Sequence, residues 1–276
     1  MKKKNVLVVG MARSGTSLTA GIFGRNGYHV GAIASERLRE GDDNNPFGYF
    51  EADDLIDHNV GLLRLAGFRS HNTWLYEPVD EAVVTALAGL EPGEPERKLL
   101  KAYAAHAPWV WKDPRLCYTL PVWWKLLDPE TTCVLLVERD PEQVYRSFRR
   151  KGWCSGGERR QVIERALHHT QTARDTVLRL EIPHLILSYG DTLREPGRTA
   201  ERIGAVCGLQ LTATQLNVRP ELDHSRGRSR LAGALRGQLA RLPVGWRRRL
   251  SRIAPRRLLR GLIPEWRYVS RRRSGD

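Results

Sequence analysis

The sequence predicts an α/β fold in which a central parallel β-sheet lies between two layers of helices. Residues 5–10 form a short, continuously apolar run that ends in glycine, which is typical of a strand buried on both faces. Similar runs recur along the chain with helical patterns between them, as in parallel sheets joined by crossover helices. The chain has 276 residues, of which 41% are apolar, so it can bury one large core.

The expected elements follow from hydrophobic periodicity along the chain. Strand 5–10 leads through a glycine-containing turn into a helix at 18–25. Three further apolar runs predict strands at 109–111, 132–138 and 184–187. Helices are expected at 53–66, 80–90, 95–106, 118–127, 141–151, 158–180 and 192–208.

The net charge of +14 belongs to the carboxyl-terminal segment. Residues 224–276 contain 16 of the 45 basic residues and only 2 of the 31 acidic residues, so residues 1–223 are balanced. We expect residues 1–223 to form the folded domain, followed by an Arg-rich extension. The extension offers a contact with an anionic membrane surface, and we expect no specific nucleic acid. A solvated tail without a partner is the alternative, and a basic-tail binding protein without enzymatic activity is the corresponding alternative function.

Four cysteines, at positions 117, 133, 154 and 207, lie far apart and show no paired spacing. We therefore expect reduced thiols, without a zinc site or a disulfide framework. The apolar stretch after Lys4 ends at Gly10, which is too short for a signal peptide, and no segment approaches the ~20 apolar residues of a membrane span. We expect a soluble, cytoplasmic protein, with the extension providing any contact with the inner face of the membrane.

The strongest local signal is the segment 10–17, Gly-Met-Ala-Arg-Ser-Gly-Thr-Ser, between the first strand and the first helix. Such a turn directs backbone N–H groups and the positive end of a helix dipole at one point, which suits a phosphate. The predicted fold is therefore a P-loop-type three-layer sandwich. Nucleotide triphosphatases carry lysine after the second glycine, where this chain has Thr16, and the cation here is Arg13. A P-loop kinase of a nucleoside or small alcohol is thus the weaker enzymatic alternative.

The segment Arg13-Ser14-Gly15-Thr16-Ser17 resembles the loop of sulfotransferases that use 3′-phosphoadenosine 5′-phosphosulfate. A second match is Arg139-Asp140-Pro141 after a strand, with Ser147 on the following helix. A strand-end arginine and a helical serine can converge on one phosphate at the sheet crevice. The resemblance implies that Arg13, Ser14, Gly15, Thr16 and Ser17 bind the 5′-phosphosulfate and that Arg139 and Ser147 bind the 3′-phosphate. It implies no metal.

Two further segments suggest the groups that act on the sulfonate and on the acceptor. Lys112-Asp113-Pro114 resembles a family stretch whose lysine contacts the sulfonate, so Lys112 is expected to stabilise charge there. Asp113 is expected to cap a turn or to hold Lys112 or Arg115 in place. Residues 45–51, Asn-Pro-Phe-Gly-Tyr-Phe-Glu, resemble a bacterial segment that ends in glutamate. A carboxylate walled by aromatic rings would have a raised pKa, so Glu51 is the expected base for an acceptor hydroxyl.

Several alternatives stay open for these roles. Glu36 and Glu40 are rivals for the base, and His58 and His106 are weaker ones because an isolated histidine on a helix is more often structural. Arg226 and Arg228 lie where family members carry a basic loop over the 3′-phosphate. Aromatic residues between positions 30 and 106 would suit a small aryl alcohol, a polyketide, a glycolipid or a saccharide as acceptor. The expected product of the donor is 3′-phosphoadenosine 5′-phosphate.

Overall fold

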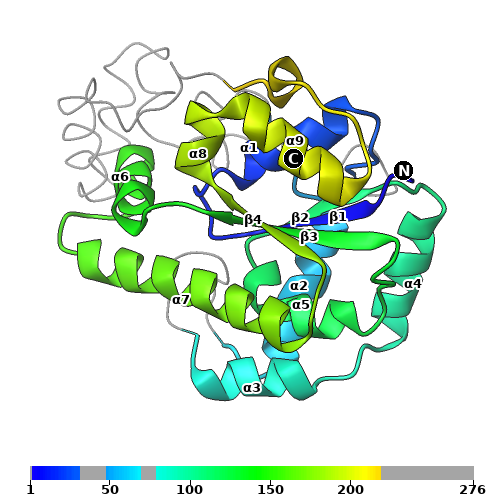
Figure 1. The fold of residues 1–276 in the computed structure, drawn as a ribbon. Coiled ribbons are helices and arrows are strands. Elements are labelled where there is room, and N and C mark those ends of the chain that lie inside the picture. The colour runs from blue at the N-terminus through cyan, green and yellow to red at the C-terminus, as the bar shows by residue number, and fades with distance from the viewer. Residues whose placement is uncertain (1, 32–47, 70–78, 219–276) are drawn as a thin grey trace, which may run out of the picture.

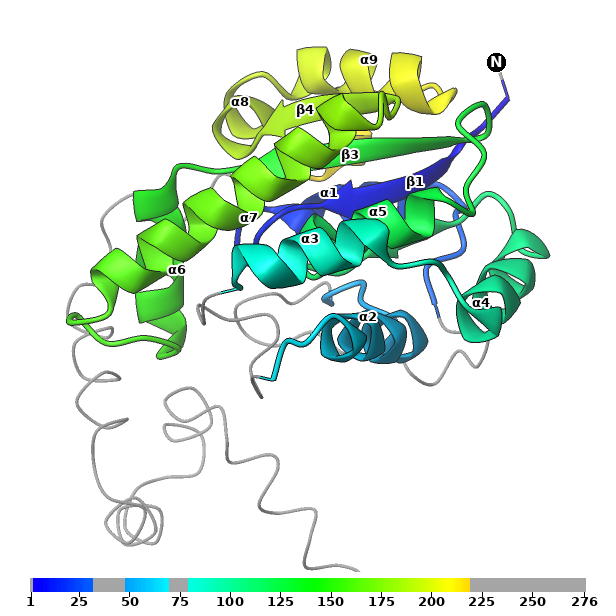
Figure 2. The ribbon, with the colours of Figure 1, turned by 90° about the horizontal axis from the view of Figure 1, so that it is seen from below.

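The computed structural model describes residues 2–31, 48–69 and 79–218. Its centre is a parallel sheet of four strands in the order β2-β1-β3-β4, flanked by helices on both faces (Figures 1 and 2). The predicted α/β class and parallel sheet are confirmed. The Arg-rich extension lies outside the described residues. The strands are β1 (Asn5–Val9), β2 (Val110–Lys112), β3 (Thr132–Glu138) and β4 (His184–Ser188).

The four strands pair in parallel, and their short apolar runs lie side by side. In the central pair, Val6 lies opposite Cys133, and the pairing continues in step to Val9, the last residue of β1, opposite Leu136. β1 also pairs with β2 through Leu7 and Trp111, and β3 pairs with β4 through Leu136 and Ile186. All four carboxyl ends therefore point to the same edge of the sheet.

Alternation along the strands divides the core into two halves. Val6 and Val8 of β1 pack on one face with α1 (Thr16–Arg25) and α9 (Pro196–Cys207). Leu7 and Val9 face the opposite side, as successive residues of a strand must. Figure 1 shows α1, α8 and α9 above the sheet, and α2, α3, α5 and α7 below it. The lower layer comprises α2 (Asp53–Leu65), α3 (Glu81–Gly89), α5 (Leu116–Trp124) and α7 (Arg159–Arg179), with α4 (Glu94–Ala104) at its side.

Several expected boundaries were wrong; the first helix, for example, begins at Thr16 and not at residue 18. The helix expected at 192–208 is two helices, α8 (Tyr189–Arg194) and α9, because Pro196 has no N–H to donate and instead occupies the first turn of a new helix. The short strand begins at Val110 and extends to Lys112, one residue later than expected. The helix expected at 118–127 is α5, which begins at Leu116, because the turn through Asp113 starts it earlier. The 141–151 helix is confirmed as α6 (Pro141–Lys151).

No helix in the described ranges is both long enough and apolar enough to cross a membrane. The four cysteines are all free thiols and all buried.

Candidate active site

The loop between β1 and α1 forms a tight turn that only glycine can occupy at two points. Gly15, which caps α1, has a φ of 101°, a conformation that side chains disfavour. A Cβ at Gly15 would lie 2.3 Å from Cδ2 of Tyr189, and one at Gly10 would lie 2.5 Å from the carbonyl oxygen of Val137. The glycines therefore let the loop lie directly against the ends of β3 and β4.

Arg13 occupies a strained position in the same loop. Its φ is 70°, in the left-handed region that non-glycine residues rarely adopt. Nε of Arg13 donates a hydrogen bond to Oγ of Ser147 at 3.0 Å. The side chain of Arg13 thus lies beside Ser147 on α6, which the sequence assigned to the other phosphate.

Arg139 joins the same cluster from the end of β3. Its Nη1 donates to the carbonyl oxygen of Arg13 at 3.1 Å, and its Nε donates to Oε1 of Gln143 at 3.2 Å. Asp140 accepts a hydrogen bond from the backbone N–H of Gln143 and so caps α6. Arg13, Arg139 and Ser147, predicted from two separate motifs, are therefore brought together at one edge of the sheet.

Tyr189 is a member of this cluster that the sequence motifs did not assign to the site. It directly follows β4, and the Cζ atom of Arg139 lies 4.2 Å from the centre of its ring. Such a contact holds a guanidinium over an aromatic face. We call Arg13, Arg139, Ser147 and Tyr189 the loop cluster. The available signal was the position of Tyr189, two residues after the strand predicted at 184–187.

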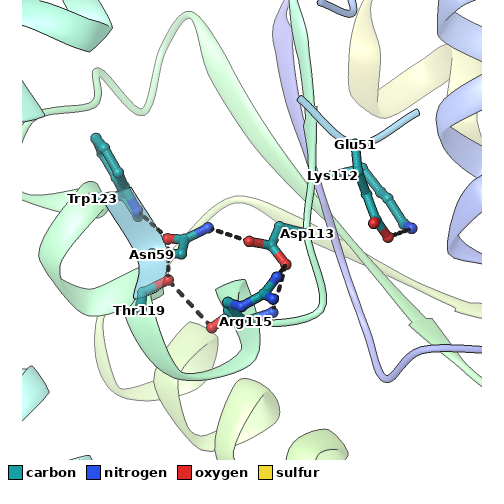
Figure 3. Close-up of polar contacts among 7 residues, drawn as sticks. All are labelled: Glu51, Asn59, Lys112, Asp113, Arg115, Thr119 and Trp123. Carbon is teal, nitrogen blue, oxygen red and sulfur yellow. Dashed lines mark hydrogen bonds and ion pairs between the residues drawn. The ribbon is translucent and has the colours of Figure 1, made fainter. Parts of the chain in front are cut away.

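Lys112 and Glu51 form a buried ion pair at the end of β2. Nζ of Lys112 donates to Oε1 of Glu51, and the two side chains are 3% and 7% exposed (Figure 3). Lys112 is the last residue of β2, and Glu51 precedes α2. Two residues that lie 61 positions apart are thus in direct contact. Lys112 is thus a buried partner of Glu51 that the aromatic residues next to Glu51 in sequence did not indicate.

Phe50 fixes the approach of Glu51 to the sheet. Its φ is 53°, and its ring covers the two glycines on α1: a Cβ at Gly21 would lie 2.9 Å from that ring, and one at Gly24 would lie 3.4 Å from it. The glycines, three residues apart on one helix face, give the ring a flat surface. The next residue is thereby directed toward Lys112.

Asp113 accepts hydrogen bonds from the backbone N–H of Arg115 at 3.1 Å and from its Nη1 at 2.7 Å. The prediction that Asp113 holds Arg115 is confirmed. Asn59 on α2 donates to the other carboxylate oxygen at 2.8 Å. Figure 3 shows this group beside the Glu51–Lys112 pair.

Lys151 is a buried cation that the sequence did not single out. It ends α6 and is 5% exposed, and its Nζ lies 5.8 Å from the ring centres of both Tyr49 and Trp153. The Cζ atom of Arg13 lies 5.7 Å from the Trp153 ring. A surface-type residue at a helix end carries no sequence signal for burial, which explains why it was missed.

The alternative bases have other surroundings or lie outside the described residues. Nδ1 of His58 lies 3.3 Å from Oε1 of Glu96 on α4. His106 is stacked on His29 with ring centres 4.6 Å apart and precedes β2, at the opposite edge of the sheet from Lys112. Glu36, Glu40, Arg226 and Arg228 are not in the described ranges. Within those ranges, no group of three or more His, Cys, Asp or Glu side chains is arranged to hold a metal ion.

Every strand contributes to one edge of the sheet. Gly10, Lys112, Arg139 and Tyr189 lie at the carboxyl ends of β1, β2, β3 and β4. Ligands of open α/β sheets bind at this edge. The arrangement combines a loop for anions, arginine and serine donors, and a buried carboxylate–ammonium pair.

Comparison with known proteins finds similarity at the level of solved structures. No protein-family model matches the chain, and no curated protein matches it. A sulfotransferase from Mycobacterium tuberculosis H37Rv is similar with a TM-score of 0.47 and 16% identity, covering 87% of this chain and 76% of that one. A sulfotransferase from Mycobacterium avium has a TM-score of 0.46 and 14% identity, covering 82% and 69% of the two chains. The sulfotransferase domain of the Synechococcus PCC 7002 olefin synthase has a TM-score of 0.41 and 18% identity, covering 83% and 82%.

These structural neighbours are sulfotransferases, the family that the sequence motifs resemble. With every TM-score below 0.5, we infer nothing about the reaction from them. The residues at the sheet edge carry the functional proposal.

Proposed function

We propose that this protein transfers a sulfonate group from 3′-phosphoadenosine 5′-phosphosulfate to the hydroxyl of an acceptor. The observation that carries the proposal is the meeting of the loop cluster and the Glu51–Lys112 pair at the carboxyl ends of four parallel strands. The cluster suits a ligand with separated anionic groups, and the pair suits proton removal beside a charged reaction centre. The acceptor is a hydroxyl compound of small-molecule, glycolipid or saccharide type.

The loop and its neighbours would bind the donor. The backbone N–H groups of residues 14–17 at the start of α1 would receive the 5′-phosphosulfate. Arg139 and Ser147 would bind the 3′-phosphate. Arg13 contacts both of these residues and would therefore bridge the 5′-phosphosulfate and the 3′-phosphate. Arg226 and Arg228 remain proposed additional contacts to the 3′-phosphate.

The Glu51–Lys112 pair would act on the reacting atoms. A carboxylate oxygen of Glu51 accepts the proton of the acceptor hydroxyl as that oxygen attacks sulfur in line. The bond between sulfur and the bridging phosphate oxygen breaks, and its electron pair stays on the departing phosphate. Lys112 stabilises the negative charge that develops on the sulfonate and bridging oxygens. Most of the acceleration then comes from positioning and electrostatics, as in phosphoryl transfer.

Calorimetric titration with 3′-phosphoadenosine 5′-phosphate tests the donor site. We expect binding without added metal, and at least about a hundredfold weaker binding of adenosine 5′-phosphate, because the 3′-phosphate interactions are lost. Transfer of labelled sulfonate to a panel of aryl and saccharide alcohols then tests the reaction. Mg²⁺-dependent binding of ATP, without binding of the 3′-phosphorylated nucleotide, would contradict the proposal and favour a kinase.

A further inference from the structure

A buried hydrogen-bond network adjoins the Glu51–Lys112 pair. We call it the Asn59 network; its members are Asn59, Asp113, Arg115, Thr119 and Trp123 (Figure 3). Asn59 and Thr119 are fully buried, and Asp113 is 1% exposed. Nothing in the proposed reaction uses Asn59, yet it contacts the residue that follows Lys112.

Asn59 is held in one orientation by its partners. Its Oδ1 accepts hydrogen bonds from Oγ1 of Thr119 at 2.7 Å and from Nε1 of Trp123 at 2.8 Å. An indole N–H can only donate, so the amide oxygen faces Trp123. The amide nitrogen therefore faces Asp113 and donates to its Oδ2 at 2.8 Å.

The network connects the two elements that carry the ion pair. Glu51 lies two residues before the start of α2, and Asn59 lies in the middle of this helix. Lys112 ends β2, and Asp113 is the next residue. The hydrogen bond from Asn59 to Asp113 thus joins the helix that follows Glu51 to the chain that leaves Lys112. Thr119 and Trp123 connect the same amide to α5.

We infer that Asn59 is a positioning residue that sets the separation and direction of Glu51 relative to Lys112 by way of Asp113. This inference rests on the proposed function, because the proposed function gives Glu51 and Lys112 their roles. Buried, fully paired polar networks have few alternative arrangements, because each unsatisfied member costs free energy. Loss of the bond between Asn59 and Asp113 would leave α2 free to shift against β2, and such small misplacements lower rates strongly.

A reciprocal exchange tests the inference. Asn59→Asp places two carboxylates together, and Asp113→Asn removes the carboxylate that binds Arg115. In the double variant, the carboxylate at position 59 can accept from Thr119, Trp123 and the new amide. The amide oxygen at position 113 can accept from Arg115. Every hydrogen bond of the network is then restored, with the negative charge moved from position 113 to position 59.

The measurement is turnover of 3′-phosphoadenosine 5′-phosphosulfate with phenol as the acceptor probe, and with water alone, alongside calorimetric affinity for 3′-phosphoadenosine 5′-phosphate. We expect each single variant to lower kcat about tenfold or more while its affinity stays within about threefold of the wild type. The double variant should recover kcat to within about threefold. Thr119→Val is the matched control, because Asn59 keeps Trp123 and Asp113 as partners; it should lower Tm by a few degrees with kcat nearly unchanged.

The outcomes separate the inference from the proposed function. Wild-type protein that turns over neither acceptor overturns both. Wild-type turnover with unchanged kcat in the single variants overturns the inference alone. A double variant that stays inactive also overturns it, since the charge of Asp113 would then act directly. Equal losses of affinity and kcat would indicate general disruption of the site and overturn it. If Asn59→Asp does not fold, Asn59→Ser, which is too short to reach Asp113, should show the same loss of kcat with retained affinity.

Discussion

The loop cluster and the Glu51–Lys112 pair lie at the same sheet edge but are built differently. The loop cluster comes from the segments that follow β1, β3 and β4, and the side chains of its two arginines are only partly buried. The pair is buried and depends on α2, α5 and the Asn59 network for its geometry. Both sides join positions far apart in the sequence, but the loop cluster comes from segments that directly follow strands, whereas Glu51 comes from the chain before α2.

The largest expected effect falls on the pair. Glu51→Gln removes the proposed base and should lower the rate of sulfonate transfer about 10² to 10⁴-fold, with donor affinity nearly unchanged. Lys112→Met should produce a comparable loss, because it removes stabilisation of the developing charge. The transfer rate of the double variant should be only slightly lower than that of the less active single variant, because the two side chains act as a unit. Rates are measured by transfer of labelled sulfonate. A nearly wild-type rate for Glu51→Gln would mean that Glu51 is not the base and would favour Glu36 or Glu40.

The next largest effect falls on the loop. Gly15→Ala combines a disfavoured φ with a clash against Tyr189 and should weaken binding of 3′-phosphoadenosine 5′-phosphate by about a hundredfold. Gly67→Ala is the matched control, because Gly67 has a φ of 96° and nothing lies within 4 Å of its added Cβ. It should cost stability but leave affinity within about threefold. Calorimetry and thermal unfolding measure the two quantities; equal affinity losses in both variants would mean that backbone strain alone is responsible.

A smaller effect is expected for Arg139→Ala. The loss of charge-assisted hydrogen bonds to a phosphate corresponds to about 2 kcal/mol, or roughly thirtyfold in affinity for 3′-phosphoadenosine 5′-phosphate. Arg146 on α6 is the control: its side chain is exposed, and within the described residues it forms an ion pair with Glu142. Arg146→Ala should therefore change the affinity less than about threefold. Titration of both variants compares them directly. A loss for Arg139→Ala no larger than that for Arg146→Ala would remove Arg139 from the donor site.

The two sides of the site also differ in how far the sequence could predict them. The loop, Arg139 and Ser147 belong to short motifs next to predicted strands, and parallel strands place their carboxyl ends together. Their convergence was therefore predictable, and the structure places Arg13 and Ser147 within hydrogen-bond distance. The assignment of Arg13 to one phosphate and Ser147 to another did not anticipate that contact, because the direction of a side chain in a left-handed turn is not encoded in its motif.

For the Glu51–Lys112 pair, the sequence predicted the two residues but not the contact between them. Glu51 and Lys112 were both identified, but Glu51 does not follow a strand, so the predicted sheet did not place it beside Lys112. Asn59 carries no motif, and its role follows only from α2 lying against α5. Among the elements, the strand at 132–138 was predicted to the residue, whereas the break before Pro196 was overlooked although proline carried the signal.

The smallest expected effect concerns the labelling of two buried cysteines, which tests whether the layers above and below the sheet open separately. Cys117 lies on α5, below the sheet, and burial raises the pKa of its thiol to about 12, from an ordinary value of 9.0. The fold thus favours the neutral thiol, and this stabilising contribution is complete below about pH 9 and is lost as the pH rises toward about 12. Only the thiolate is nucleophilic, so iodoacetamide at pH 8 should label Cys117 in native protein at least about a hundredfold more slowly than in urea.

Cys133 on β3 supplies the internal comparison, because it is equally buried and contacts the layer above the sheet through Cys207, with sulfurs 3.5 Å apart. If labelling requires unfolding of the whole domain, both cysteines must react at the same rate, since each then has an ordinary thiol. We expect equal rates, because the Asn59 network ties α5 to α2 and to the end of β2. Mass spectrometry of labelled peptides gives the ratio. Faster labelling of Cys117 would mean that the layer below the sheet, which contains α5, opens while the layer above it stays closed.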